Sequence, residues 1–193
     1  PHTAASPSAP ESLPASLPLV PELPAEDNIP LEIERKFLVD PDDLPSDMAT
    51  RGKSYTIEQT YLSIEPEIRI RRISGHQYYF AVKLPRDEEG LSRAEIDFKI
   101  TEDAYTRLVE MRTGNTIYKT RYQFEEEGSK VFVDVYSEDL EGLVVVEVQF
   151  SSVEEAESFV PPAWFGEDVT ADKRYKNAQL SIHGMPNPRL LED

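Results

Sequence analysis

The feature that most constrains the fold is the alternation of charged and apolar residues within successive short segments. In the first of them, Glu32, Glu34 and Lys36 alternate with Ile33 and Phe37. Side chains on a strand point to opposite faces in turn, so this pattern predicts a strand with one charged and one apolar face. The same period of two recurs in segments at about 67–74, 77–84, 92–100, 117–125, 130–136 and 143–150.

These charged faces can be placed in two ways. An antiparallel sheet can cover a core with one face and expose the other to water. Alternatively, the sheet closes into a barrel whose charged face points inward, around a polyanion and its metal ions. Basic residues recur as i, i+2 pairs on some segments and acidic residues on others. Such segregation suits a ligand that needs cations for its phosphate oxygens and carboxylates for a divalent metal. The residues alone leave both placements open.

The charged residues that share this phase form the candidate site. Taken singly, each is better explained by a surface ion pair, whereas the whole set on successive strands favours a binding site. The carboxylates could hold Mg²⁺ or Mn²⁺, which prefer oxygen ligands, and the cations could neutralise a compact phosphate chain. The carboxylates are Glu32, Glu34, Glu95, Asp97, Asp134 and Glu147, and the cations are Lys36, Arg69, Arg71, Lys83, Lys119 and Arg121.

The composition argues against several classes of function. The formal net charge of −17 disfavours general nucleic-acid binding, which needs a broad basic surface. The absence of cysteine excludes disulfides, thiolate zinc sites and cysteine nucleophiles. Glycine-rich nucleotide-binding motifs are absent, and no histidine pair has metal-ligand spacing. No apolar run is long enough to span a bilayer and no signal peptide is visible, so we expect a cytoplasmic protein with no membrane partner.

The first 29 residues differ in composition from the rest of the chain. Residues 1–29 contain no lysine or arginine and are rich in proline, alanine and serine. This composition predicts a disordered tail, with docking to a partner as the alternative. A folded domain is expected over residues 30–184, in which the acidic segment 86–90 is typical of a hairpin connection, and a C-terminal tail follows at 185–193.

Helix signals interrupt the strand pattern at a few places. Thr101 is a candidate N-cap for a helix at about 102–112, with Gly114 as its stop signal. Ser152 opens a capping box, and a last helix is expected at about 170–182. A further strand-like segment at about 55–64 brings the number of expected antiparallel strands to eight, and with these helices they predict the α+β class. The expected architecture is an eight-stranded antiparallel closed β-barrel, or tunnel, with flanking helices, because closure removes exposed sheet edges.

The opening motif resembles that of a known family. The run Glu32-Ile-Glu-Arg-Lys36 is similar to the E-x-E-x-K signature of the CYTH domain, the triphosphate tunnel metalloenzyme family. Further landmarks of that family follow in order over residues 31–184. They include Gln59-Thr-Tyr61-Leu62, Ile68-Arg-Ile-Arg71, Lys83, Arg93-Ala-Glu95-Ile-Asp97, Lys119-Thr-Arg121, Val133-Asp134-Val135, Val146-Glu147-Val148 and Arg174-Tyr175-x-Asn177.

The resemblance implies a tunnel lined by charges and the metal-dependent cleavage of a triphosphate compound. Inorganic tripolyphosphate is the expected substrate, cleaved to pyrophosphate and phosphate with Mg²⁺ or Mn²⁺ as cofactor. The six cations would bind the phosphate chain. The expected catalytic residues are Glu32, Glu34, Lys36 and Glu147, with the three glutamates holding a metal ion that activates water.

Three alternatives share much of this pattern: a class IV adenylyl cyclase, a thiamine triphosphatase and a non-catalytic polyphosphate-binding module. One departure from the family motivates the last of them. The final strand usually carries Glu-x-Glu, whereas this chain has Glu147-Val-Gln149. Gln149 keeps an oxygen that can bind a metal but brings no charge to it. The resemblance also implies a homodimer.

Overall fold

The computed structural model describes residues 31–84 and 93–187. The predicted N-terminal tail, the predicted hairpin connection at 86–90 and most of the predicted C-terminal tail lie outside these residues. Within the described ranges, no helix is long and apolar enough to cross a membrane.

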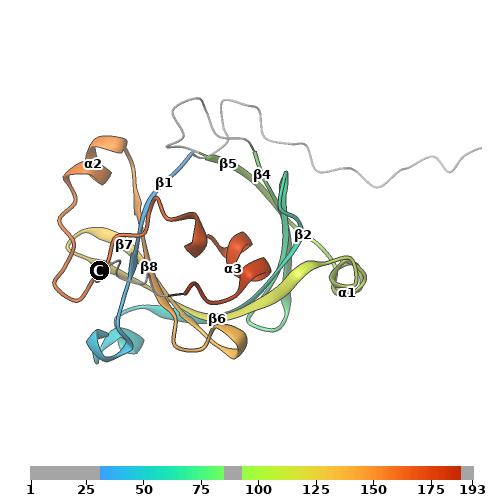
Figure 1. Cartoon of the computed structure of the whole chain (residues 1–193), viewed down its shortest axis with the longest axis horizontal. Helices are drawn as coiled ribbons and strands as arrows, with labels where there is room; N and C mark the ends of the chain where they lie inside the picture. Colours follow the sequence, from blue (N-terminus) through green and yellow to red (C-terminus); the bar gives the residue numbers. More distant parts are fainter. Residues whose placement is uncertain (1–30, 85–92, 188–193) are drawn as a thin grey trace, which may run out of the picture.

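All eight strands belong to one antiparallel sheet that curls into a ring (Figure 1). The ring order is β1-β5-β4-β3-β2-β6-β7-β8, and β8 pairs with β1 again. This confirms the predicted α+β class and eight-stranded antiparallel tunnel. The strands are β1 (Leu31–Leu38), β2 (Lys53–Ser63), β3 (Glu67–Ile73), β4 (Gln77–Lys83), β5 (Arg93–Lys99), β6 (Thr113–Glu126), β7 (Ser129–Tyr136) and β8 (Val144–Phe150).

Strand β1 has a partner on each side. On one side it pairs with β8 along the whole stretch from Ile33 to Leu38. On the other side Leu31 pairs with Ala94 and Glu32 with Arg93 of β5, and this ladder reaches the edge of the described residues. The two ladders together close the ring.

Short helices connect and cover the strands. Thr101 caps α1 as predicted, since its hydroxyl accepts a hydrogen bond from the Ala104 amide at 3.1 Å. The helix ends at Val109, however, and Gly114 lies in β6, because residues from Thr113 onward pair with β2. The helical elements are η2 (Pro41–Asp43), η3 (Met48–Thr50), α1 (Glu102–Val109), η4 (Glu138–Leu140), α2 (Val153–Ser158), η5 (Lys173–Tyr175) and α3 (Asn177–His183).

The capping box before α2 is present, whereas the last helix begins later than predicted. The Ser152 hydroxyl accepts from the Glu155 amide at 3.2 Å, and the Glu155 carboxylate accepts from the Ser151 amide at 2.9 Å. Helix α3 starts at Asn177 rather than near residue 170, because the preceding backbone bonds to β1: the Val169 amide donates to the Lys36 carbonyl at 2.8 Å.

The outer face of the barrel carries the larger apolar core. Phe37 of β1, Val133 of β7 and Val146 of β8 pack there with Phe165, which lies in the segment after α2. On each of these strands, the residues one position away point to the lumen, which follows from the period of two. The apolar half of the predicted pattern therefore faces the covering segments.

A smaller apolar core lies inside the barrel, where α3 sits against β2 and β6 (Figure 1). Ala178 and Leu180 of α3 pack on Tyr61, Ile117 and other inward-facing residues. Helix α3 thus fills one part of the lumen, and the remaining part is charged.

The contact between α3 and β6 requires glycine at position 114. Gly114 has a φ of 71°, and a Cβ there would lie 2.6 Å from the Ser181 carbonyl oxygen. We expect Gly114→Ala to lower the free energy of unfolding by about 3 kcal/mol, as the sum of left-handed backbone strain and overpacking. Gly128→Ala is the control, because Gly128 has a φ of 82° with nothing within 4 Å of its Cβ position; it should cost about 1 kcal/mol. Urea unfolding measures both, and equal losses would contradict the close-approach argument.

Candidate functional site

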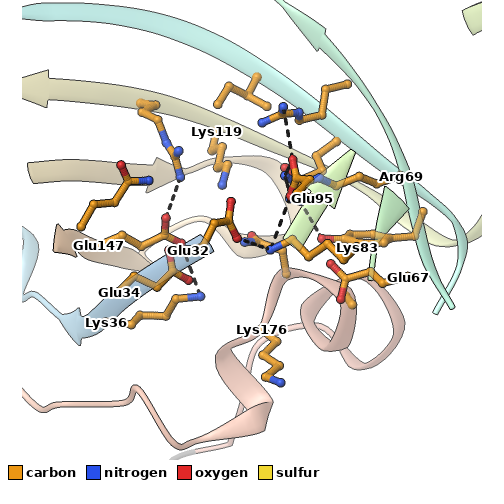
Figure 2. A pocket seen from close by; sticks show the side chains of 18 of the residues that line it. Glu32, Glu34, Lys36, Glu67, Arg69, Lys83, Glu95, Lys119, Glu147 and Lys176 are labelled. Atoms are coloured by element: carbon orange, nitrogen blue, oxygen red, sulfur yellow. Dashed lines mark hydrogen bonds and ion pairs between the residues drawn. The ribbon is translucent and has the colours of Figure 1, made fainter. Parts of the chain in front are cut away.

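One cavity of about 320 Å³ lies inside the barrel among the described residues (Figure 2). Its described wall comes from inward-facing positions of seven strands, all except β7, and from the C-terminal segment before and within α3. Most of the residues predicted from the sequence lie in this wall. They are Glu32, Glu34, Lys36, Arg69, Arg71, Lys83, Glu95, Lys119, Arg121, Glu147 and Gln149.

Two predicted residues do not line the cavity. Asp97 accepts a hydrogen bond from Arg71, a residue of the wall, at 2.5 Å. Asp134 is completely buried behind Lys119 and Arg121 and bonds to both of them. Both carboxylates therefore contact cations of the wall instead of the cavity itself.

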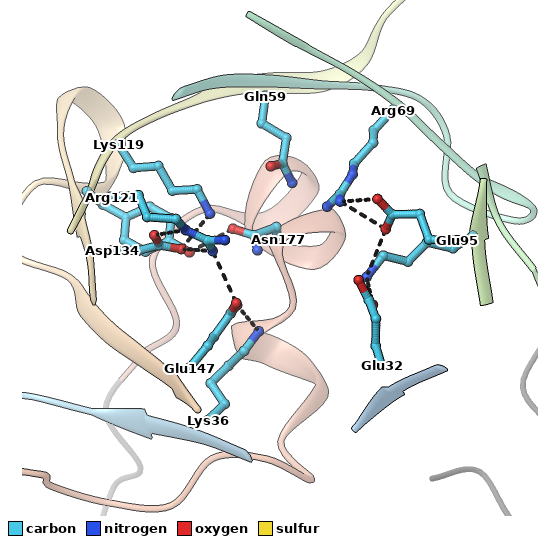
Figure 3. A network of polar contacts seen from close by, with 12 residues as sticks. Glu32, Lys36, Gln59, Arg69, Glu95, Lys119, Arg121, Asp134, Glu147 and Asn177 are labelled. Carbon is cyan, nitrogen blue, oxygen red and sulfur yellow. Dashed lines mark hydrogen bonds and ion pairs between the residues drawn. The ribbon is translucent and has the colours of Figure 1, made fainter. Parts of the chain in front are cut away.

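The charged residues form two clusters on opposite sides of the cavity (Figure 3). The first, called here the β6–β8 cluster, contains Lys36, Lys119, Arg121, Asp134 and Glu147. Arg121 joins its two carboxylates, lying 2.7 Å from Asp134 and 3.1 Å from Glu147. Lys36 lies 3.4 Å from the other oxygen of Glu147, and these two residues are directly opposed in the β1–β8 ladder.

The second cluster, called here the β3–β5 cluster, contains Glu32, Arg69, Arg71, Lys83 and Glu95. Arg69 donates to both oxygens of Glu95, at 2.9 and 3.0 Å. Lys83 lies 3.3 Å from Glu32 and 3.7 Å from Glu95. Each basic residue in both clusters thus has a carboxylate partner, which reduces the repulsion among the cations.

Burial and pairing shift the pKa values of the β6–β8 cluster. Burial lowers the pKa of Lys119 to about 8, although the neighbouring Asp134 opposes this shift. Burial would raise the pKa of Glu147, but the charges of Lys36 and Arg121 outweigh it and hold the pKa well below its usual value. Glu147 is therefore ionised throughout the neutral range.

Glu34, by contrast, has a raised pKa and lacks a close cation in the described part of the chain. The negative charge of Glu147, followed by burial, raises the pKa of Glu34 from 4.5 to about 6. Among the described residues, no ion pair or hydrogen bond of the Glu34 carboxylate is found within 4.0 Å. It also lies directly across the β1–β8 ladder from Gln149. A carboxylate that is repelled by a second one and lacks a close cation is a suitable ligand for a metal ion.

The donor set fits a divalent cation that also binds phosphate. Glu34, Glu147 and Gln149 supply oxygens from neighbouring strands, with Glu32 two residues away on β1. No group of three or more acidic or histidine side chains in the described residues is already arranged as a metal cage. Mg²⁺ does not require such a cage, since it commonly takes one or two carboxylates and completes its shell with water and substrate phosphates.

Several residues of the wall were not assigned a role from the sequence. Thr170, Lys176 and Asn177 reach the cavity from the C-terminal segment. The Thr170 hydroxyl accepts from the Lys36 amide at 3.0 Å, which holds this segment against β1. The family landmarks that end at Thr170 and at Asn177 were the signals for this segment in the sequence, but its approach to the cavity depends on tertiary packing.

Gln59 and Tyr61 of β2 also belong to the wall. Both are almost fully buried, and the Gln59 amide donates to the Tyr61 hydroxyl at 2.6 Å. They lie in the same phase as Ile57, so the period of two along β2 could have placed them facing inward.

Comparison with known proteins agrees with this geometry. Residues 30–169 match the family described as the CYTH domain. An inorganic triphosphatase of Nitrosomonas europaea is 38% identical over 159 residues, which are 78% of this chain and 97% of that protein. An inorganic triphosphatase of Acetivibrio thermocellus is 32% identical over 151 residues, which are 77% of this chain and 92% of that protein. A crystal structure described as an inorganic triphosphatase has a TM-score of 0.59 at 34% identity, covering 81% of this chain and 97% of that one.

The raised pKa of Glu34 predicts a stability cost at neutral pH. The folded state binds the Glu34 proton more tightly than the unfolded state, so stability falls as pH rises from 4.5 to about 6 and stays lower above that. Glu34→Gln should therefore raise the free energy of unfolding at pH 7 by about 2 kcal/mol in metal-free buffer, and by nothing near pH 4. Urea unfolding with EDTA at both pH values measures this.

Glu147→Gln is the matched comparison, because Glu147 faces the same cavity with a lowered pKa. Its ionised form stabilises the fold above the unfolded-state pKa, and this contribution is lost as pH falls through the folded-state pKa. The substitution should therefore destabilise the protein at pH 7. The same sign for both variants would contradict the electrostatic assignment.

Proposed function

The chain belongs to the CYTH domain family, and we propose that it hydrolyses inorganic tripolyphosphate to pyrophosphate and phosphate in the barrel cavity. The observation that carries this proposal is the convergence of six cations on one enclosed site. Relatives that are 38% and 32% identical are named inorganic triphosphatase. The cations are Lys36, Arg69, Arg71, Lys83, Lys119 and Arg121.

The size and chemistry of the cavity favour an unsubstituted phosphate chain. A volume of about 320 Å³ is at the lower end of small-molecule pockets, which span roughly 300–1,000 Å³. Tyr61 is the one aromatic residue of its described lining. It is 1% exposed and its hydroxyl is bonded to Gln59, so it offers no open face for stacking a base. These features support tripolyphosphate over a nucleotide.

The residues of the two clusters would divide the work of binding. In the β3–β5 cluster, Arg69 and Lys83 share Glu95, and phosphate oxygens can compete with this carboxylate at the cavity surface. In the β6–β8 cluster, Lys119 and Arg121 present further donors from the opposite wall. Held between them, the phosphate chain is oriented and its charge neutralised, which is the main contribution of protein groups to phosphoryl transfer.

Mg²⁺ or Mn²⁺ is the proposed cofactor. Glu32, Glu34, Glu147 and Gln149 would hold it, since they supply oxygen ligands from adjacent positions of β1 and β8. A divalent ion bound there would polarise phosphate oxygens and lower the pKa of a bound water. Glu95 and Asp97, which pair with Arg69 and Arg71, would instead serve as counter-ions of the basic wall.

A substrate panel tests the proposal against its alternatives. We expect purified protein with Mg²⁺ or Mn²⁺ to release phosphate and pyrophosphate in equal amounts from tripolyphosphate, and to act far more slowly on ATP and thiamine triphosphate. Cyclic AMP from ATP would indicate a cyclase, faster cleavage of thiamine triphosphate would indicate a thiamine triphosphatase, and binding without turnover would indicate a binding module. Glu34→Gln is the control for contaminating phosphatases, because it removes a proposed ligand charge and should abolish the activity.

Gln149 allows a second test, directed at the metal. We expect Gln149→Glu to lower the Mg²⁺ concentration that gives half-maximal activity, because it adds a negative charge beside Glu34 and Glu147, and oxygen-ligand sites depend strongly on ligand charge. A metal titration at saturating tripolyphosphate measures this. An unchanged titration curve would show that position 149 is not a ligand position.

The remaining sequence expectations are not tested by the fold or the comparisons. Homodimerisation, the lack of nucleic-acid partners and the cytoplasmic location stay predictions.

A further inference from the structure

We propose that Asp134 is a positioning residue that fixes Lys119 and Arg121 in the cavity wall, and that it is not a metal ligand. The proposal rests on the proposed function, since these two cations are taken to bind the phosphate chain. It differs from the prediction made from the sequence, which grouped Asp134 with the metal-binding carboxylates.

The carboxylate of Asp134 is fully engaged by cations. Its Oδ1 accepts from Arg121 Nε at 2.7 Å, and its Oδ2 accepts from Arg121 at 2.8 Å and from Lys119 Nζ at 2.6 Å. The residue is 0% exposed and does not line the cavity. A metal ion in the cavity would therefore have to displace one of these cations to reach it.

Two aromatic residues on the same face of β7 as Asp134 also contact Lys119 and Arg121. Arg121 lies over the ring of Phe132 at 5.0 Å, and Lys119 lies over the ring of Tyr136 at 5.4 Å. The ladder register explains this arrangement, because Lys119 opposes Tyr136 and Arg121 opposes Asp134. Each cation is thus held by a carboxylate and an aromatic face, and both contacts restrict its position.

The counter-ions of the opposite cluster are placed differently. The side chains of Glu95 and Asp97 are 12% and 31% exposed, and Glu95 itself lines the cavity. Their cations can exchange carboxylate for phosphate oxygens at the surface. Asp134 is out of reach of the cavity, so it keeps its cations when a phosphate chain enters. Lys119 and Arg121 are therefore already in place before a phosphate chain binds, whereas the cations of the β3–β5 cluster change partners when it binds.

Removing the charge of Asp134 would have two opposing effects on an anionic ligand. The loss of a nearby negative charge would strengthen the attraction. The loss of the shared acceptor would leave Lys119 and Arg121 as adjacent like charges in a buried site, and they would separate. A positioning role requires the second effect to dominate, whereas a mere counter-charge requires the first.

Calorimetry of tripolyphosphate binding in EDTA separates these outcomes without relying on turnover. We expect Asp134→Asn in the full chain to bind tripolyphosphate at least about tenfold more weakly than the unmodified protein. Mn²⁺ binding in the absence of tripolyphosphate should be unchanged. Equal or tighter tripolyphosphate binding would overturn the positioning role, and weaker Mn²⁺ binding would identify a metal ligand. If the unmodified protein bound no tripolyphosphate, the proposed function would fall as well.

A second variant keeps the test decisive if Asp134→Asn does not fold, as judged by circular dichroism. Phe132→Leu removes the ring beneath Arg121 without leaving a buried charge unpaired, and it should weaken tripolyphosphate binding by about fivefold. Unchanged binding would overturn the proposal. Glu58→Gln is the matched control, because Glu58 also pairs with an arginine across neighbouring strands, Arg72 at 3.3 Å, but away from the cavity; it should bind tripolyphosphate as the unmodified protein does.

Discussion

The pairing of the six cations of the two clusters with carboxylates is the interaction on which the barrel depends. An isolated charge in a closed sheet would cost several kcal/mol, and adjacent like charges would cost more. Strand register achieves part of this pairing: Arg121 opposes Asp134 and Lys36 opposes Glu147, so these two acids each meet a base on the neighbouring strand. The lumen can then hold many ionised groups while the sheet stays closed.

The outer face of β8 packs in the apolar core and stabilises the fold, whereas the inner face of the same strand carries residues of the candidate site. On β8, Val146 and Val148 point outward into the apolar core, whereas Glu147 between them points inward. A fully buried valine contributes about 1.5–3 kcal/mol, which offsets the cost of the charged neighbour. The segments that cover the outer face are therefore as necessary to the cavity as its own lining.

The sequence predicts the strand phases well because a period of two is a local property of each segment. It predicts that Arg69, Lys119 and Glu147 lie on the charged face of their strands, and the family resemblance implies that this face points inward, but neither can tell which acid lies at the cavity surface. Asp134 and Glu147 have the same pattern of neighbours, and only the packing of β7 against β6 places Asp134 behind the cations. The late start of α3 is likewise set by the hydrogen bonds of the preceding segment to β1, which no local signal records.

The ladder between β1 and β8 has a mechanical consequence. Strand β1 pairs with β8 at every position from Ile33 to Leu38, and the opposed residues include Glu34 with Gln149 and Lys36 with Glu147. Backbones that are hydrogen-bonded pair by pair along a ladder open as one cooperative unit. The spacing among these four side chains is thus set by the distance between two bonded strands, and it is kept when other parts of the chain move.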